Sequence, residues 1–341
     1  MYKFHLYTLQ EINRDEYENY PRKNLFTTIE YLTFLSKWKN VNPIIVKISD
    51  DADSLIGYFT GCSFKKFGIK ILGSPFFGYM GQHMGFDFVD INQANKSEIL
   101  DELIRFLKKR KVMSLMVFAD FQFSPEDIAQ CKTKLFHNDI RGTYMLDLTL
   151  PEDIIFKNFK SGYRTCVRKF EKLGGTIVEE WSEDLMKVHH QQLKEVFERK
   201  KLSPPNYEDR LYLLHKMYPD MIYAIKALDA NGNNIASSFY LMGGTFAFFQ
   251  SNASYTDALL YNANQALMWH AIKHFKNKGL KTLDLAGRAS YKENFGATLY
   301  NTPTTIWTKY AFLYRILMIT RKAYYSTFRL KFKFKELFSK K

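Results

Sequence analysis

The stretch TLPEDIIFKNFKSGYRTCVRKFEKLGG, residues 149–175, is the most informative part of the sequence. Its apolar residues recur every three or four positions, which predicts a helical stretch with one buried face. Thr149 and Glu152, with Pro151 in the first turn, predict a capping box, and Gly162 allows a division into two helices. The apolar positions are Ile155, Phe159, Tyr163, Cys166, Phe170 and Leu173.

Cations recur at the same spacing on the opposite face of this stretch. No acidic residue interrupts their row, so the like charges repel one another and invite a phosphate-bearing partner. A solvated basic helix face explains the row equally well. The row consists of Lys157, Lys160, Arg164, Arg168 and Lys172.

Outside this stretch, the two halves of the chain repeat one order of elements. The repeat predicts two tandem α/β units, each a mixed, mostly antiparallel sheet flanked by helices. We expect an N-terminal domain over residues 1–145, a C-terminal domain over 146–310 and a basic amphipathic tail over 311–341. The expected helices are 26–38, 96–110, 183–200, 207–217 and 263–278, and the expected strands are 2–8, 43–48, 54–62, 67–72, 112–119, 221–228, 234–241, 245–252 and 281–286.

The net charge of +14 points to an anionic partner. Residues 311–341 hold nine Lys or Arg and one Glu, so most of the excess lies in the tail. Aromatic residues interleave with these cations at a period near two, which suits an edge strand or a segment that lies on an anionic membrane surface. Nucleic acid is the competing anion, and a basic terminus without a partner is the third interpretation.

Other features limit the class of protein. The three cysteines are scattered, which provides neither a disulfide framework nor a zinc site, and we expect no metal. No apolar run approaches the ~20 residues that cross a bilayer. Residues 1–16 read as a strand and turn rather than a signal peptide. We therefore expect a cytoplasmic protein, either soluble or peripheral on the inner face of the membrane.

A second informative stretch, LDLAGRASYKENFG, spans residues 283–296. A strand is expected to end at Ala286, and ligands in α/β sheets tend to bind beyond the carboxyl ends of strands. Arg288, Tyr291 and Lys292 follow that end, where a cation can stabilise an oxyanion or a phosphate. An ordinary polar surface loop is the alternative.

The loop GSPFFGYMGQHMGF, residues 73–86, combines glycines with aromatic residues. Glycines let the backbone approach a ligand closely, and aromatic side chains such as Tyr79 can line a groove. A tight loop with its own small core is equally compatible with this composition. His83 in this loop and Asp284 are candidates for a general base, and the sequence does not decide between them.

Together, these segments resemble the FemAB-type branch of the GNAT acyltransferase superfamily. Residues 146–175 are similar to the family's strand and acidic helix that run into a basic R-x-x-x-R-K-x-x-x-x-G stretch. YNANQALMWHAIKHFKNKGLKTLDLAG, residues 261–287, resembles its later helix and strand, YKENFG, 291–296, its Phe-Lys-x-x-Phe-Gly run, and NLFTTIEYLTFLSK, 24–37, its opening helix. The resemblance implies a pair of GNAT-like domains.

By position, the resemblance also implies roles for single residues. Lys37 and Arg168 match the cations that hold an acceptor's diphosphate. Lys292 matches the lysine associated with the acyl-transfer step, and Tyr291 replaces the family's usual Phe. The expected catalytic residues are Lys292 and Tyr291, and the expected substrate-binding residues are Lys37, Arg164, Arg168, Lys169, Arg288 and Tyr79.

The resemblance leaves the acyl donor open. Family members often take an aminoacyl group from charged tRNA, but residues 183–217 leave no room for the helical arm of some tRNA-using members, so tRNA is not favoured. The stretch TDALLYNANQALMW, 256–269, lacks the glycine-rich turn that usually cradles the pyrophosphate of coenzyme A. We expect acyl-CoA, an acyl carrier or aminoacyl-tRNA as co-substrate and no tightly bound cofactor.

The expected function is an acyltransferase that forms an amide on a nucleotide- or lipid-linked precursor of the cell envelope or of a surface polysaccharide. Lys292 and backbone amides would stabilise the oxyanion. Lys37, Arg164 and Arg168 would position the phosphates. The alternative is a non-catalytic basic adaptor that binds an anionic membrane surface or nucleic acid through its tail, and DNA is not an expected partner of the enzyme.

Overall fold

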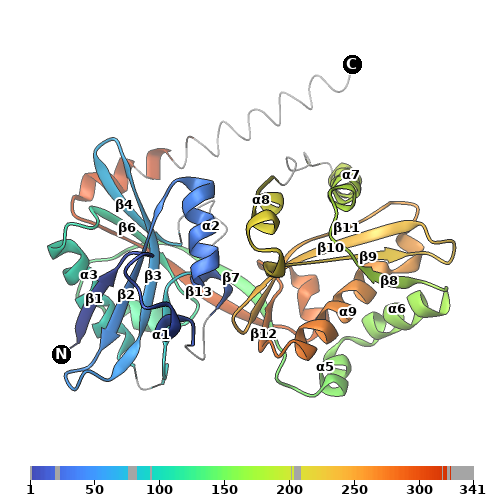
Figure 1. Ribbon diagram of the computed structural model, residues 1–341, viewed down its shortest axis with the longest axis horizontal. Coiled ribbons are helices and arrows are strands. Elements are labelled where there is room, and N and C mark those ends of the chain that lie inside the picture. The colour runs from blue at the N-terminus through green and yellow to red at the C-terminus, as the bar shows by residue number, and fades with distance from the viewer. Residues whose placement is uncertain are drawn as a thin grey trace.

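The computed structural model describes residues 2–19, 24–75, 83–92, 94–200, 202, 209–316, 318–320 and 323. Within these residues the chain forms two lobes that share one 13-stranded sheet (Figure 1). The mixed α/β architecture expected from the sequence is confirmed, because each lobe combines antiparallel strands with one parallel pair.

The first lobe is an antiparallel meander that a helical crossover closes. Its elements are β1 (Lys3–Tyr7), α1 (Arg14–Glu18), η1 (Leu25–Thr27), α2 (Ile29–Lys39), β2 (Asn42–Ser49), β3 (Leu55–Lys66), β4 (Ile69–Ser74), β5 (Phe86–Phe88), α3 (Lys96–Lys109), β6 (Leu115–Ala119) and α4 (Pro125–Ala129). β6 follows α3 and pairs parallel to β4. The apolar residues of β2 alternate, so that Ile44 packs with α3 and Ile45 packs with α2 on the opposite face.

The second lobe repeats this plan. Its elements are α5 (Glu152–Asn158), α6 (Ser161–Lys172), β8 (Thr176–Glu179), α7 (Glu183–Arg199), α8 (Asp209–Met217), η2 (Pro219–Met221), β9 (Ile222–Leu228), β10 (Asn234–Gly243), β11 (Phe246–Ser254), η3 (Leu259–Tyr261), α9 (Ala263–Asn277), β12 (Thr282–Asp284) and η4 (Ser290–Phe295). β12 follows α9 and pairs parallel to β11. α7 covers one face of the sheet, and α6 and α9 cover the other (Figure 1).

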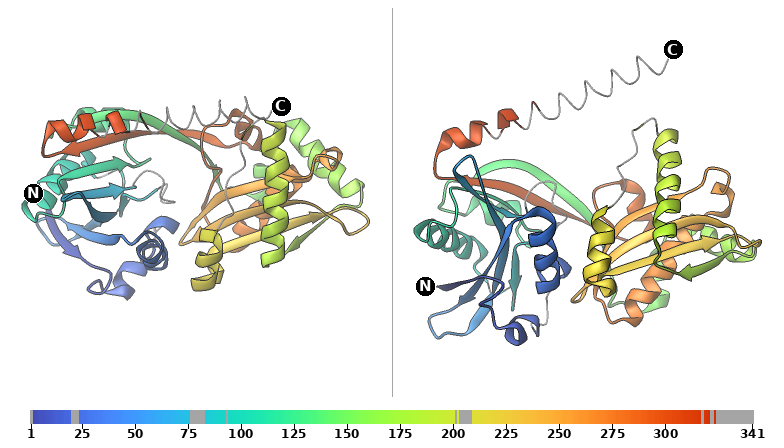
Figure 2. Two further views of the ribbon diagram at one scale, coloured as in Figure 1. Left: turned by 90° about the horizontal axis from the view of Figure 1, so that it is seen from above. Right: turned by 45° about the horizontal axis from the view of Figure 1, so that its top comes forward.

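The two lobes exchange their last strands. β7 (Phe136–Asp147) follows the first lobe but pairs with β12 of the second, and β13 (Thr298–Thr308) follows the second lobe but pairs with β6 of the first. β7 and β13 also pair with each other, so the sheet order runs β1-β2-β3-β4-β6-β13-β7-β12-β11-β10-β9-β8. Figure 2 shows these two long strands crossing from one lobe to the other. The expected division at residue 145 falls within β7 and stays a prediction.

An apolar core fills the interface between the lobes. Phe26 of η1 packs edge-to-face on Phe248 of β11, with ring centroids 5.3 Å apart. Leu211 and Leu214 of α8 are buried in the same cluster as α2. Burial of apolar surface at about 25 cal/mol per Å² holds the lobes in a fixed relation, which positions any site that draws on both.

The sequence predicted a capping box and a division into two helices within residues 149–162, and only the second prediction is correct. The capping box is wrong, because the Thr149 hydroxyl bonds to Asp147 and the helix begins later, with Pro151 at its N-cap and no side-chain cap. The division into two helices is confirmed, but the break lies at Phe159 and Lys160, and Gly162 falls in the first turn of α6.

The end of the chain is described only in part. Residues 311–316 are helical, as are 318–320 and 323, and the rest of the tail expected over 311–341 lies outside the described residues. Among the residues that the structure describes, no helix has the length and apolar character needed to cross a membrane.

Candidate active site

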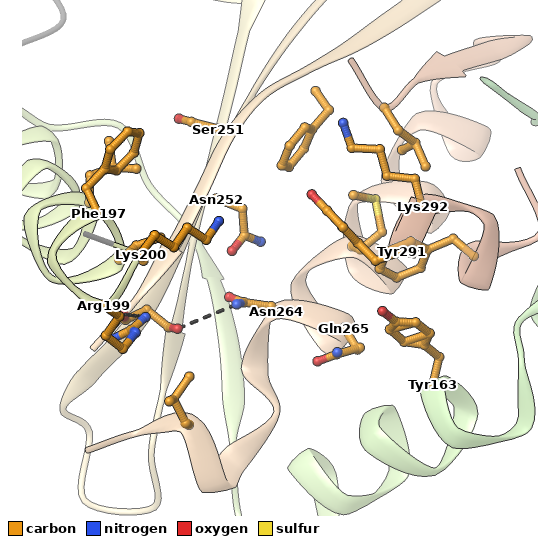
Figure 3. A pocket seen from close by; sticks show the side chains of 18 residues that line it. Tyr163, Phe197, Arg199, Lys200, Ser251, Asn252, Asn264, Gln265, Tyr291 and Lys292 are labelled. Carbon is orange, nitrogen blue, oxygen red and sulfur yellow. Dashed lines mark hydrogen bonds between the residues drawn. The ribbon is translucent and has the colours of Figure 1, made fainter. Parts of the chain in front are cut away.

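A pocket opens in the second lobe where β11 and β12 separate. The two strands pair only from Phe246 to Phe248 on β11, opposite Thr282 to Asp284 on β12, while β11 continues to Ser254. A cavity of about 450 Å³ occupies the space beyond the last pair (Figure 3). An edge of β11 without a partner strand offers its backbone groups to an extended ligand.

The pocket has an apolar middle and a cationic group at each end. The apolar side chains come from several elements, among them α7, β11, α9 and η4, and η4 closes one end (Figure 3). The lining residues are Tyr163, Leu193, Val196, Phe197, Arg199, Lys200, Phe249, Ser251, Asn252, Ser254, Leu259, Asn264, Gln265, Met268, Leu285, Tyr291, Lys292 and Phe295. This arrangement suits a ligand with an apolar stem, a polar carbonyl at one end and an anionic group at the other.

Lys292 of η4 forms the first cationic end. Its side chain is buried, and its Nζ donates a hydrogen bond to the carbonyl oxygen of Ala286. Nζ also lies 6.0 Å from the ring centroid of Phe249 and 5.7 Å from that of Tyr291. Burial lowers the pKa of Lys292, and the nearby Asp284 carboxylate opposes that shift. The amine therefore holds its positive charge less firmly than an exposed lysine does.

Arg199 and Lys200, at the end of α7, form the second cationic end beside the start of α9. The N-cap of α9, Asn262, makes no side-chain cap hydrogen bond, and the Gln265 N–H bonds to the carbonyl oxygen of Asn262 at 3.3 Å. The backbone N–H groups of the first two residues of the helix therefore receive no side-chain cap. Asn264 and Gln265 in this first turn line the pocket. A helix N-terminus beside two cations favours an anion such as a phosphate.

The sequence did not single out this second cationic end of the pocket. No glycine-rich turn precedes α9 in the sequence, and the structure has Asn262 with a left-handed φ of 56° at that point. Asparagine adopts this conformation more readily than most residues, so it can replace glycine in the turn. Asn262, directly before the helix, was the residue in the sequence that could have indicated this turn. Arg199 and Lys200 could not be linked to it, because they lie about 60 residues earlier in the chain.

The expected site residues divide between this pocket and other surfaces. Tyr291 and Lys292 line the pocket together. Arg164 instead donates to the carbonyl oxygens of Lys157, at 2.8 Å, and Phe159. Arg168 lies over the ring of Phe156 at 5.7 Å.

The other expected binding residues also lie away from the pocket lining. Lys37 is exposed in the last turn of α2, and Lys169 is exposed on α6. Arg288 is exposed and lies against β7, with its Nη1 3.5 Å from the carbonyl oxygen of Ile140. Tyr79 lies outside the described residues. The structure does not bring Lys37, Arg168 and Lys292 into this one pocket.

The comparisons with known proteins bear on both lobes. Residues 157–293 match the family model for the acetyltransferase (GNAT) domain. This range holds α6 to β12 and part of η4, and with them every residue of the pocket lining except Phe295. The second lobe is a GNAT acyltransferase domain. No curated protein matches the chain.

Solved structures share the fold of the whole chain beyond this GNAT domain. FemX is 12% identical, with a TM-score of 0.71 over 92% of this chain and 99% of that chain. A conserved protein of unknown function from Bacteroides thetaiotaomicron is also 12% identical, with a TM-score of 0.55 over 91% of this chain and 100% of that chain. The chain therefore combines a GNAT acyltransferase domain with the two-lobed FemX fold, as the sequence resemblance implied.

Proposed function

We propose that the protein transfers an acyl group from a phosphate-bearing donor to an amine on a nucleotide- or lipid-linked precursor of the cell envelope or a surface polysaccharide. The observation that carries this proposal is the pocket with Lys292 at one end and Arg199 and Lys200 at the other. A donor of this kind, an acyl-CoA, an acyl carrier or an aminoacyl-tRNA, joins an acyl carbonyl to a phosphate through an intervening stem.

In the proposed reaction, the protein places the two substrates and stabilises the charge that develops on the acyl carbonyl oxygen. The neutral acceptor amine attacks the acyl carbonyl carbon, and a C–N bond forms. Negative charge develops on the carbonyl oxygen, where the Lys292 ammonium and backbone N–H groups stabilise it. The bond from that carbon to the donor's sulfur or oxygen then breaks, and the amine's proton passes to the leaving group, directly or through a phosphate of the substrate.

The proposed binding of the acceptor substrate is supported by the sequence resemblance and by exposed cations. Lys37, Arg168 and Lys169 are solvent-exposed on the two lobes, where a diphosphate can reach them. Surface cations bind phosphate groups through charge-assisted hydrogen bonds. We assign them to the acceptor rather than to the donor, because none of them lines the donor pocket.

Incubation with acyl-CoA, acyl carrier and aminoacyl-tRNA donors, followed by mass spectrometry of the released acyl group, tests this function. Lys292→Ala is expected to lower kcat by about 10²- to 10³-fold, the usual scale for the loss of one oxyanion donor. Lys278→Ala, which removes an exposed lysine at the end of α9, serves as the matched control. Turnover unchanged in Lys292→Ala would contradict the assigned role, and no turnover with any donor would favour a non-catalytic adaptor.

We also propose that the chain associates with an anionic membrane surface through residues 311–341. Phe312, Ile316 and Ile319 are 57%, 50% and 67% exposed and recur at helical spacing. Exposed apolar residues beside a basic sequence favour the interface of an anionic bilayer. Sedimentation with phosphatidylglycerol vesicles is expected to be lost when these three residues are changed to Ser. Binding that persists in this variant would contradict the proposal.

A further inference from the structure

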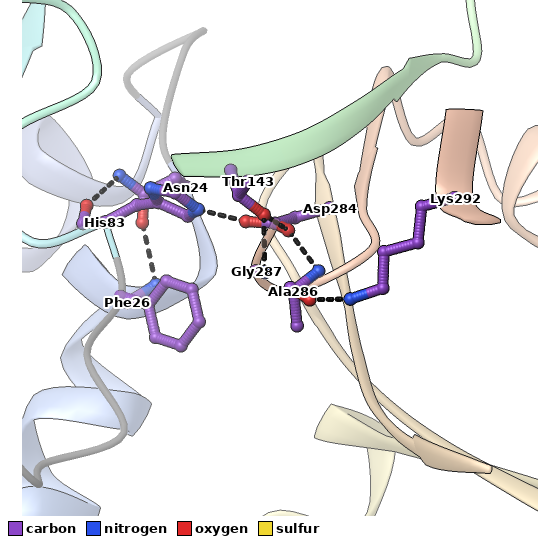
Figure 4. Close-up of polar contacts among 8 residues, drawn as sticks. All are labelled: Asn24, Phe26, His83, Thr143, Asp284, Ala286, Gly287 and Lys292. Carbon is purple, nitrogen blue, oxygen red and sulfur yellow. Dashed lines mark hydrogen bonds and ion pairs between the residues drawn. The ribbon is translucent and has the colours of Figure 1, made fainter. Parts of the chain in front are cut away.

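A buried polar network joins the two lobes behind Lys292 (Figure 4). Its centre is the contact between Nε2 of His83, in the first lobe, and Oδ2 of Asp284, the last residue of β12. These side chains are only 5% and 1% exposed. Asn24 donates from its Nδ2 to the backbone oxygen of His83 at 3.0 Å. Polar groups so deeply buried are costly unless they are paired, so this network has a specific arrangement to maintain.

The second oxygen of the Asp284 carboxylate holds the turn that follows β12. Oδ1 accepts hydrogen bonds from the Thr143 hydroxyl and from the backbone nitrogen of Ala286, the latter at 2.5 Å. Thr143 Oγ1 accepts in turn from the backbone nitrogen of Gly287 at 3.1 Å. Ala286 has a φ of 58°, a left-handed value that a residue with a Cβ atom seldom adopts. Asp284 and Thr143 therefore hold a strained backbone in place.

This turn provides the binding group for the catalytic amine. The carbonyl oxygen of Ala286 accepts the hydrogen bond from Nζ of Lys292. The direction of that carbonyl follows from the backbone of Ala286, which Asp284 fixes through the Ala286 N–H. The Asp284 charge acts on Lys292 as well, because it opposes the effect of burial on the pKa of the amine.

The protonation of the network follows from its donors. The Thr143 hydroxyl and the Ala286 N–H both donate to Oδ1 of Asp284. The other oxygen, Oδ2, faces Nε2 of His83. We assign the donor in this contact to Nε2 of His83, because the oxygens of a carboxylate accept hydrogen bonds and the neighbouring oxygen already accepts two. Nδ1 of His83 is buried and has no hydrogen-bond partner among the described residues. The rings of Phe26, Phe121 and Phe246 surround the imidazole at centroid distances of 5.9, 5.0 and 5.4 Å.

We propose that His83 and Asp284 form a positioning pair through which the first lobe places the Lys292 ammonium. His83 donates to Asp284, Asp284 orders the turn at Ala286, and the Ala286 carbonyl and the Asp284 charge together hold Lys292 in the pocket. The catalytic consequence rests on the proposed acyl transfer. The position and ionisation of Lys292 can be measured without any turnover.

Labelling of Lys292 by an amine-reactive acid anhydride, followed by peptide mass spectrometry at several pH values, tests the pair directly. Only the neutral amine reacts, so the labelling rate reports the loss of its charge. Asp284→Asn is expected to label about tenfold faster near pH 8, because the carboxylate no longer stabilises the ammonium. Asp229→Asn, which changes a partly exposed carboxyl in the 229–233 turn, is the matched control with wild-type labelling.

Kinetics then separate positioning from proton transfer. Asp284→Asn is expected to lower kcat by about 10- to 100-fold, the scale for a displaced catalytic group. His83→Ala is expected to lose activity, and His83→Gln, whose amide N–H can still donate to Asp284, is expected to recover most of that loss. If His83→Gln is as slow as His83→Ala, and the acidic limb of the pH profile of kcat/KM disappears, His83 is a proton acceptor and the positioning role is overturned.

The labelling contrast also keeps the two proposals separable. Absence of acyl transfer with every donor would remove the proposed function but leave the expected difference in labelling intact. Equal labelling of wild type and Asp284→Asn would overturn the pair even in an active enzyme. If Asp284→Asn does not fold, Thr143→Val removes one hydroxyl from the same carboxylate and is expected to shift labelling in the same direction, and no shift there overturns the proposal.

Discussion

At the scale of single residues, the charge of Lys292 sets the pH range in which the proposed reaction proceeds. Burial lowers its pKa, so the amine becomes neutral at a lower pH than an exposed lysine. We expect kcat/KM to fall on the alkaline side as the oxyanion loses its cation. Lys292→Arg keeps a positive charge at any accessible pH, so its weaker activity is expected to lack that alkaline limb. An identical alkaline limb in Lys292→Arg would assign the titration to another group.

A second residue-scale prediction concerns stability. His189 is buried between the hydroxyls of Ser237 and Ser251, at 2.7 and 2.8 Å, and burial lowers its pKa to about 3. In the unfolded chain the pKa is about 6.5. Between these values the unfolded state binds the extra proton, so the free energy of unfolding falls as pH falls, by up to about 1.4 kcal/mol per pH unit.

Urea unfolding at pH 7 and pH 5 measures this linkage. The loss of stability between the two values is expected to be smaller in His189→Gln than in the wild type, because the variant has no titrating group at that position. His5→Gln, at an exposed position on β1, is expected to keep the wild-type difference. The same pH dependence in all three proteins would place the titration elsewhere.

The candidate site shows which residues a sequence can reveal. Tyr291 and Lys292 were predictable because both follow a strand end within a short motif. Arg199 and Lys200 join the same pocket from the end of α7, and only folding places them beside α9. Charge periodicity on α6 identified a basic surface, but it could not show that Arg164 turns back to the carbonyl oxygens of α5.

At the scale of elements, periodicity predicted the longer helices and the two meanders. The short elements α1, α4, β5 and β8 were missed, and so were the two strands β7 and β13 in the centre of the sheet. β13 carries Pro303, which argues against a central strand because proline cannot donate to a neighbour. In the structure Pro303 lies opposite Ile140 of β7, and pairing with β6 begins one residue later, at Thr304. The proline thus occupies a position with a neighbour on one side only, a detail that the sequence alone does not contain.

Substitution of two glycines by alanine is expected to change the free energy of unfolding in opposite directions. A Cβ atom at Gly57 in β3 would overlap the carbonyl oxygen of Asp87, so Gly57→Ala must displace the paired strand β5. We expect a loss of about 1–3 kcal/mol. Gly162, in the first turn of α6, has open space around it, and Gly162→Ala is expected to gain about 0.5–1 kcal/mol. Urea unfolding of both variants measures the two changes, and a stabilising Gly57→Ala would contradict the close approach of β5.

At the scale of the whole molecule, the exchange of β7 and β13 makes each lobe depend on the other. Tyr144 and Leu146 of β7 lie in the core of the second lobe. Trp307 of β13 lies in the core of the first. The exchange also explains why the turn after β12 meets both lobes, since Thr143 on β7 bonds to Asp284 beside it. The candidate site therefore lies in a sheet that both lobes share, and the contact between Thr143 and Asp284 depends on the exchanged strand β7.

The last prediction is that neither lobe folds alone. Separation between Leu148 and Thr149 leaves the first fragment without β13 and the second without β7, so each exposes an unpaired strand edge and part of an apolar core. We expect fragments 1–148 and 149–341 to lack a cooperative urea transition separately and to regain one when co-expressed. In the intact chain, far-ultraviolet circular dichroism and tryptophan fluorescence are expected to report a single coincident transition. A cooperative transition in fragment 1–148 alone, near the midpoint of the intact protein, would show that the first lobe is independent and that the exchanged strands contribute little to its stability.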